Sequence, residues 1–228
     1  TVSPAPSMSV SGKDQTAPAL TTTWPEDITG QNNCYANRDI SELYSDEAVA
    51  DLYSDNCGGV VTVTSSDNAT GDDCSWTVTR TYTIKDACGN TVSPAPSMSV
   101  SGKDQTAPEL TETWPSNIEN QNNCYANRDI SELYSDEAVA DLYSDNCGGV
   151  VTVTSSDNAT GDDCSWTVTR TYTIKDACGN TVSPAPSMSV SGKDQTAPAL
   201  TTTWPEDITG QNNCYANRDI SELYSDEA

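Results

Sequence analysis

The sequence repeats itself with a period of 90 residues, and this repetition limits the possible folds more than any other feature does. The segment Gln-Asn-Asn-Cys-Tyr-Ala-Asn-Arg-Asp-Ile begins at positions 31, 121 and 211, so its cysteine recurs as Cys34, Cys124 and Cys214. A unit of this size can bury a small hydrophobic core of its own, and copies in series predict a row of similar domains.

The boundaries between repeats are predicted from the segment Gly102–Pro108, which follows a strand-like run and ends in proline. Because this segment is short, neighbouring repeats are expected to lie nearly in contact. The predicted division is the last strand and linker of a preceding repeat (1–17), two complete repeats (18–107 and 108–197), and the start of a third (198–228).

Alternating apolar and polar residues predict that each repeat is built of β-strands. In residues 74–85, Trp76, Val78, Tyr82 and Ile84 occupy one face and threonines the other, which is typical of a half-buried strand. Arg80 interrupts the apolar row, and its head group is expected at the sheet edge. Further strands are predicted at 20–24, 60–65 and 92–100. A loop over 67–73 is expected to join 60–65 to 74–85 as a hairpin. The two prolines in 92–100 predict that this strand lies at an edge of the sheet.

Residues 38–53 break this pattern and predict one short helix. Ser45 is a suitable N-cap for a helix from about Asp46 to Leu52, which places Val49 toward the core. Short strands, turn residues and one short helix together predict an all-β fold of tandem immunoglobulin-like β-sandwiches, with the helix present in each repeat.

The charge of the chain is strongly acidic and excludes several kinds of partner. There are 34 acidic and 10 basic residues, a formal net charge of −24. Such a chain repels nucleic acid and anionic lipid, so neither nucleic-acid binding nor membrane insertion is expected, and no apolar run is long enough to span a bilayer.

The nine cysteines predict disulfides and an oxidising, extracellular compartment. Each period carries four of them, and the chain has no histidine, which disfavours a zinc site. Cys74 and Cys88 stand at opposite ends of one predicted strand, too far apart to bond. A pairing of Cys34 with Cys88 and of Cys57 with Cys74 joins ends that the hairpin separates. The predicted bridges are Cys34–Cys74, Cys57–Cys88, Cys124–Cys164 and Cys147–Cys178, all within single repeats.

Two segments of each repeat and the linker resemble a known family. These are 54–65 (Ser-Asp-Asn-Cys-Gly-Gly-Val-Val-Thr-Val-Thr-Ser), 78–91 (Val-Thr-Arg-Thr-Tyr-Thr-Ile-Lys-Asp-Ala-Cys-Gly-Asn-Thr) and 104–108 (Asp-Gln-Thr-Ala-Pro). They resemble the HYR-like, immunoglobulin-type repeats of giant Bacteroidota surface proteins, which include gliding-motility adhesins of the SprB type. The resemblance covers the second half of each repeat and implies surface display, tandem arrays, and adhesion or filament formation.

Calcium is the one cofactor for which the residues offer candidate ligands. Asp55, Asp86 and Asn90 fall in loops that the predicted Cys57–Cys88 bridge would bring together, and Asp104 lies in the following linker, where a cation would stiffen the joint. Hard oxygen ligands in turns suit calcium, but Asp and Asn are also ordinary turn residues. The candidate ligands are Asp55, Asp86, Asn90 and Asp104, with Asp145, Asp176, Asn180 and Asp194 at the matching positions.

Catalysis is not expected. The chain has no histidine to act as a base near neutral pH, its cysteines are predicted to be paired, and near-identical copies in series favour a mechanical role.

The predicted function is a disulfide-stabilised shaft of an extracellular, cell-surface filament or adhesin. Its expected partners are the neighbouring repeats, and also surface polysaccharide or other filament chains. Two alternatives remain open. In the first, the repeats are spacers in a secreted multidomain enzyme. In the second, they are subunits of a multi-chain polymer, and the six positions that differ between residues 1–90 and 91–180 mark two kinds of contact between chains.

Overall fold

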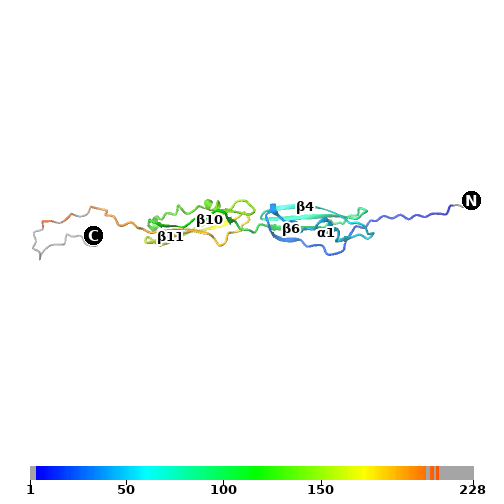
Figure 1. Ribbon diagram of the computed structural model, residues 1–228, viewed down its shortest axis with the longest axis horizontal. Coiled ribbons are helices and arrows are strands. Elements are labelled where there is room, and N and C mark those ends of the chain that lie inside the picture. Colours follow the sequence, from blue (N-terminus) through cyan, green and yellow to red (C-terminus); the bar gives the residue numbers. More distant parts are fainter. Residues whose placement is uncertain (1–3, 204–205, 208, 211–228) are drawn as a thin grey trace.

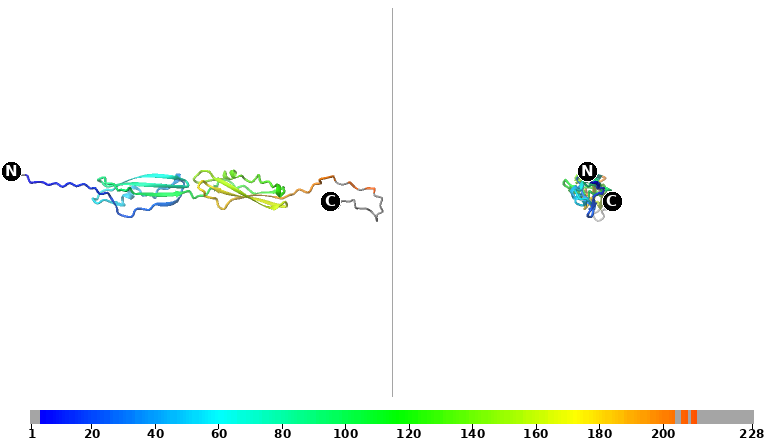
Figure 2. Two further views of the ribbon diagram at one scale, coloured as in Figure 1. Left: turned by 180° about the vertical axis from the view of Figure 1, so that it is seen from behind. Right: turned by 90° about the vertical axis from the view of Figure 1, so that its right-hand side faces the viewer.

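Two folded units follow one another along the chain and lie end to end. They are seen in a computed structural model that describes residues 4–203, 206–207 and 209–210. Figure 1 shows them as the blue-to-cyan and green-to-yellow parts of one elongated molecule. The end-on view in Figure 2 shows that the molecule is narrow across its long axis. The predicted start of a third repeat, 198–228, lies mostly outside the described residues.

A four-stranded sheet forms the main layer of each unit. In the first unit its order is β2-β6-β5-β4, and all neighbours are antiparallel except the parallel pair β2 and β6. The second unit repeats this order as β10-β11-β12-β8, read from the opposite edge. The strands are β2 (Ile28–Asn32), β4 (Thr62–Asp72), β5 (Ser75–Lys85), β6 (Ser97–Lys103), β8 (Ile118–Gln121), β10 (Thr152–Asp162), β11 (Ser165–Lys175) and β12 (Ser187–Gly192).

Shorter elements pack against one face of each sheet. A two-stranded sheet pairs β1 with β3 in the first unit and β7 with β9 in the second, and one short α-helix precedes each pair's second strand. The elements are β1 (Ala19–Leu20), β3 (Tyr53–Ser54), β7 (Glu109–Leu110), β9 (Tyr143–Ser144), the helices α1 (Asp46–Ala50) and α2 (Asp136–Ala140), and the 3-10 turns η1 (Tyr35–Asn37) and η2 (Tyr125–Asn127).

The core lies between the sheet and these shorter elements. Trp76, Val78, Tyr82 and Ile84 are each no more than 2% exposed, so the predicted inner face of the strand is confirmed. From the other side, Val49 of α1 is fully buried in the same cluster. The molecule is therefore mostly β-sheet with a few short helices, and the predicted all-β class is confirmed.

The predicted helix and its cap are also confirmed. The helix α1 begins at Asp46, and the Ser45 side chain accepts a hydrogen bond from the Ala48 amide at 3.2 Å. This bond satisfies one of the amides that the first helical turn leaves without a partner. The helix ends at Ala50, two residues earlier than predicted.

The predicted loop over 67–73 is wrong, because β4 continues through it. Pairing with β5 runs without a break from Thr62↔Lys85 to Asp72↔Ser75, which leaves a turn of only two residues. Gly71 makes this turn feasible. Its φ is +107°, and a Cβ there would lie 2.0 Å from the Ser75 carbonyl oxygen.

The predicted edge strand over 92–100 is also wrong. The strand β6 begins at Ser97, after both prolines, and lies between β2 and β5. Since the prolines precede the strand, they remove no hydrogen bond from its ladder. The predicted strand over 20–24 is reduced to β1, and Trp24 instead packs edge-on against Tyr82 with a centroid distance of 5.7 Å.

Candidate functional site

Two disulfides join the first repeat to the second, and this junction is the candidate functional site. Cys34 bonds to Cys147 with a Cα–Cα distance of 5.2 Å, and Cys74 bonds to Cys178 with a Cα–Cα distance of 4.9 Å. Both bonds cross from one repeat to the next. The predicted bridges within single repeats are therefore wrong, namely Cys34–Cys74, Cys57–Cys88, Cys124–Cys164 and Cys147–Cys178.

The prediction failed because it treated each repeat as a closed unit. Cys34 and Cys74 do lie at one end of the first repeat, where the Tyr35 amide donates to Asp73 at 2.7 Å. These two cysteines face the second repeat, however, and each bonds to a cysteine of that repeat across the junction. Among the described cysteines, those at the two outer ends carry no disulfide, namely Cys57, Cys88, Cys124 and Cys164.

The linker between the repeats is held against the first repeat by hydrogen bonds. The Asp104 amide donates to the Asp73 carbonyl oxygen at 2.7 Å, and the Gln105 amide donates to the Asn32 side chain at 2.7 Å. The Asn32 amide group also donates to Thr106 at 3.2 Å. The linker is therefore an ordered part of the junction.

Asp104 of the linker accepts hydrogen bonds from two side chains of the second repeat. The Asn180 side-chain amide donates to the Asp104 carbonyl oxygen at 3.3 Å and to its carboxylate at 3.4 Å. The Asn146 amide group donates to the Asp104 carboxylate and to Cys34 Sγ, both at 3.4 Å. The Asp104 side chain thus lies between the repeats, and the residue is only 2% exposed.

Three carboxylates meet at this place. Asp176 is 5% exposed, and the Asn180 side chain donates to it at 2.6 Å. Burial raises the pKa of Asp145 above its usual value, and the charges of Asp104 and Asp176 raise it further, against the hydrogen bond from the Cys147 amide. One oxygen of Asp145, Oδ1, is buried without a hydrogen-bond partner.

Four of the eight predicted calcium ligands therefore converge at the junction: Asp104, Asp145, Asp176 and Asn180. Side-chain oxygens of Asp104 and Asp145 lie within 4.8 Å of each other and of Cys147 Sγ. The sulfur belongs to a disulfide and is a poor ligand for a hard cation, so the carboxylates are the groups that suit one.

The matching residues of the first repeat form the same cluster at its outer end. Asn90 donates to Asp86 through its backbone amide at 2.8 Å and through its side chain at 2.6 Å. Carboxylate oxygens of Asp55 and Asp14 lie within 4.8 Å of each other. Sequence reasoning missed Asp14, although it stands 90 residues before Asp104 in an identical segment.

Asp194, the eighth predicted ligand, lies at the far end of the second repeat. It is exposed, its amide donates to the Asp163 carbonyl oxygen at 2.7 Å, and its carboxylate accepts from Thr196 at 2.8 Å. The described residues place no other acidic side chain of the candidate set beside it.

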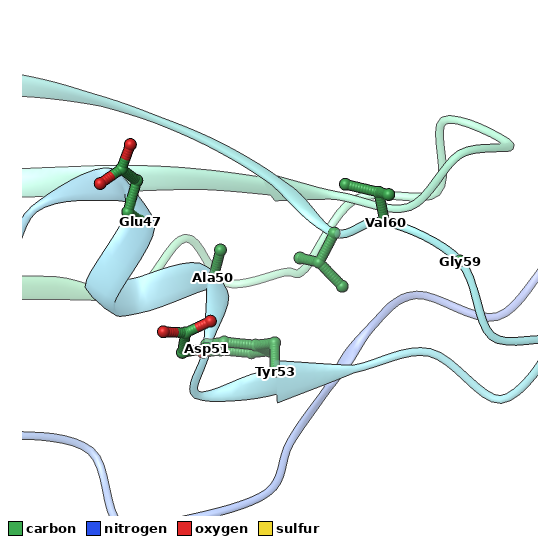
Figure 3. A pocket seen from close by; sticks show the side chains of 7 residues that line it. Glu47, Ala50, Asp51, Tyr53, Gly59 and Val60 are labelled. Atoms are coloured by element: carbon green, nitrogen blue, oxygen red, sulfur yellow. The ribbon is translucent and has the colours of Figure 1, made fainter.

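A second feature is an open hollow of about 430 Å³ beside α1. Figure 3 shows Glu47 and Ala50 of the helix, with Asp51 just after it, on one side and Val60 on the other. The two carboxylates are exposed to solvent. No buried polar group lines the hollow among the described residues, so it lacks the features of a catalytic centre.

The disulfides indicate an oxidising compartment such as the extracellular space. Among the described residues, no helix combines the length and the apolar character needed to cross a membrane. No protein-family model and no curated protein sequence matches the chain.

Proposed function

We propose that this chain is a section of the shaft of an extracellular, cell-surface filament or adhesin. In this proposal each repeat is an immunoglobulin-like β-sandwich of the HYR-like type, displayed in a tandem array and without enzymatic activity. The observation that carries the proposal is the pair of disulfides across one junction, because two covalent bonds and a bonded linker hold neighbouring repeats in one orientation.

A shaft needs resistance to bending and to extension, and the junction supplies both. A single bond permits rotation about itself, whereas two bonds from different loops prevent the repeats from swinging apart. When the shaft is pulled, the load crosses the junction through Cys34–Cys147 and Cys74–Cys178 as well as through the peptide chain. The strongly acidic surface keeps a long chain soluble and discourages side-by-side association.

Electron microscopy of source cells, labelled with an antibody against one repeat, tests this function. We expect label along threads that project from the cell surface, with a thread thickness that matches one chain. Label confined to diffuse secreted material would contradict the proposal and favour spacers of a secreted enzyme. Threads several chains thick would favour the multi-chain polymer.

The junction also supports a second candidate function, binding of a calcium ion between the repeats. Asp104, Asp145 and Asp176 bring three carboxylates together in a chain of net charge −24, and Asp145 Oδ1 has no hydrogen-bond partner. A cation there would offset the repulsion between the carboxylates and add a further link between repeats.

Thermal unfolding in the presence of calcium or a chelator tests this candidate. Calcium is expected to raise the melting temperature, because a ligand at about 100 times its Kd stabilises the folded state by about 2.7 kcal/mol. Asp104→Asn is expected to remove the effect of calcium while raising the melting temperature of the chelated protein slightly, since it relieves repulsion. Asp194→Asn is the matched control, because this identical linker residue is exposed. An equal melting temperature with calcium and with chelator would contradict the site.

A further inference from the structure

The four cysteines without disulfides occupy the same positions in the repeat as the four bonded ones. Cys57 and Cys88 stand 90 residues before Cys147 and Cys178, and Cys124 and Cys164 stand 90 residues after Cys34 and Cys74. Each repeat therefore has one end with the Cys34 and Cys74 positions, and an opposite end with the Cys57 and Cys88 positions.

The open cysteines are held by the same local contacts as the bonded ones. Cys124 and Cys34 share the backbone angles φ −64° and ψ 153° at the start of their 3-10 turns. The Cys57 amide donates to Asp55 at 3.0 Å, as the Cys147 amide donates to Asp145 at 2.9 Å. These ends are thus already arranged for the junction.

Matching residues are less exposed to solvent at the junction than at the outer end of the second repeat. Cys34 is 5% exposed at the junction, whereas its counterpart Cys124 is half-buried. Asp104 is 2% exposed, but Asp194 at the matching place is exposed. The observed junction covers these groups only because a neighbouring repeat lies on them.

We propose that Cys124 and Cys164 form two further disulfides with the counterparts of Cys57 and Cys88 in the repeat that follows in the same chain. By the same rule, Cys57 and Cys88 bond to the repeat that precedes them. The partner is thus another copy of the 90-residue repeat, and the interface is head-to-tail, so it propagates in one direction along the chain.

The same chain is the favoured source of the partner because the linker is bonded to the repeat before it. The Lys193 amide donates to the Gln121 carbonyl oxygen at 2.9 Å, and the Gln195 amide donates to the Asn122 side chain at 2.7 Å. The next repeat therefore begins beside Cys124 and Cys164, and its effective concentration there exceeds that of a second chain.

Each bond forms by oxidation of two thiols. The two sulfurs join, two protons are released, and two electrons pass to a disulfide of an oxidoreductase or of a small molecule, which is reduced to two thiols. One junction therefore consumes two equivalents of such a disulfide. The result is a shaft with two covalent cross-links at every junction, and this inference rests on the proposed shaft function.

Differential alkylation of two chains tests the inference. The first is the 228-residue chain, and the second is extended by the same period to complete the third repeat. After oxidation with glutathione disulfide, unpaired thiols are alkylated and the peptides are mapped without reduction. We expect Cys124 and Cys164 to be alkylated in the first chain and protected in the second, whereas Cys57 and Cys88 are alkylated in both and serve as the internal control.

Three outcomes would overturn the inference. These are alkylation of Cys124 and Cys164 in both chains, a bond between these two cysteines, or disulfide-linked oligomers whose amount rises with protein concentration. The mapping substitutes no residue in the two observed repeats, and resistance of the added repeat to brief proteolysis confirms that it is folded before alkylation is read. The proposed function fails separately, since the Cys34–Cys147 and Cys74–Cys178 peptides report the observed junction in the same experiment.

Discussion

At the scale of single residues, the contact between Arg80 and Asp67 combines a charge pair with a strand pairing. The two residues face each other on β5 and β4, and the guanidinium donates to both carboxylate oxygens at 2.7 Å. Arg80 also reaches the Leu43 carbonyl oxygen at 3.4 Å. The side chain therefore ties the sheet edge to the segment before α1, and the second repeat has the same ion pair between Arg170 and Asp157.

Replacing Asp67 and Asp157 by Asn is predicted to lower the free energy of unfolding by about 1 kcal/mol per repeat at neutral pH. The Arg80 hydrogen bonds and charge hold the pKa of Asp67 below its usual value against the effect of burial. A lowered pKa means that the contribution is present above the unfolded pKa of about 3.9 and is lost as pH falls through the folded pKa.

Denaturant unfolding of the 228-residue chain at several pH values measures this effect. The difference between the parent chain and the Asn variant should shrink as the pH falls below about 4, because Asp67 and Asp157 of the parent chain then become protonated and lose their charge. Asp51→Asn with Asp141→Asn is the control, because it removes the same number of charges from exposed sites at the helix ends. Equal losses in both variants would show that the ion pair adds nothing beyond net charge.

At the scale of elements, the lengths of the strands depend on their neighbours. The sequence Ser66–Gly71 has the composition of a loop, with Asp, Asn and Gly, yet it forms the second half of β4. The reason is that β5 offers an unbroken ladder to pair with. Polar residues are tolerated there because most of β4 is exposed, so their side chains remain in water.

The position of β6 within its sheet is a second case where neighbours decide. Two prolines just before the strand favour an edge from the sequence alone, but Tyr82 donates its amide to the Pro96 carbonyl oxygen at 2.9 Å. A proline has no amide hydrogen and yet keeps its acceptor, so it can flank an inner strand. Burial then favours the inner place, since Val100 is fully buried between β2 and β5.

At the scale of the whole molecule, the junction determines the shape. The two repeats lie end to end (Figure 1), and both disulfides and the linker are at the place where they meet. Each bridge is expected to add about 2–4 kcal/mol to the free energy of unfolding. The shape is therefore a property of the contact between repeats, in addition to the fold of each repeat.

Replacing the four junction cysteines Cys34, Cys74, Cys147 and Cys178 by serine is predicted to let the repeats move relative to each other. Small-angle scattering should show a broader distribution of distances and a shorter mean end-to-end length than in the parent chain. The control replaces Cys57, Cys88, Cys124 and Cys164, which carry no disulfide, and should retain the parent profile. A junction variant that scatters like the parent would show that the linker alone fixes the shape.

The sequence by itself determined the features that depend on short stretches of chain. The alternation of Trp76, Val78, Tyr82 and Ile84 sufficed to predict a buried strand face, and Ser45 sufficed to predict a helix cap. The sequence also marked Asp104, Asp145, Asp176 and Asn180 as candidate ligands, but their meeting across the junction is seen only in the structure.

Only the tertiary structure decided which cysteines pair. Spacing shows that Cys34 and Cys74 belong to one end of the repeat, but identical copies offer the same residues in every repeat. A partner 113 residues away, Cys147, is therefore as well marked in the sequence as one 40 residues away, Cys74. Which of the two bonds to Cys34 depends on where the loops at the end of the sheet point. Their positions are set only when the strands have assembled and the repeats lie end to end.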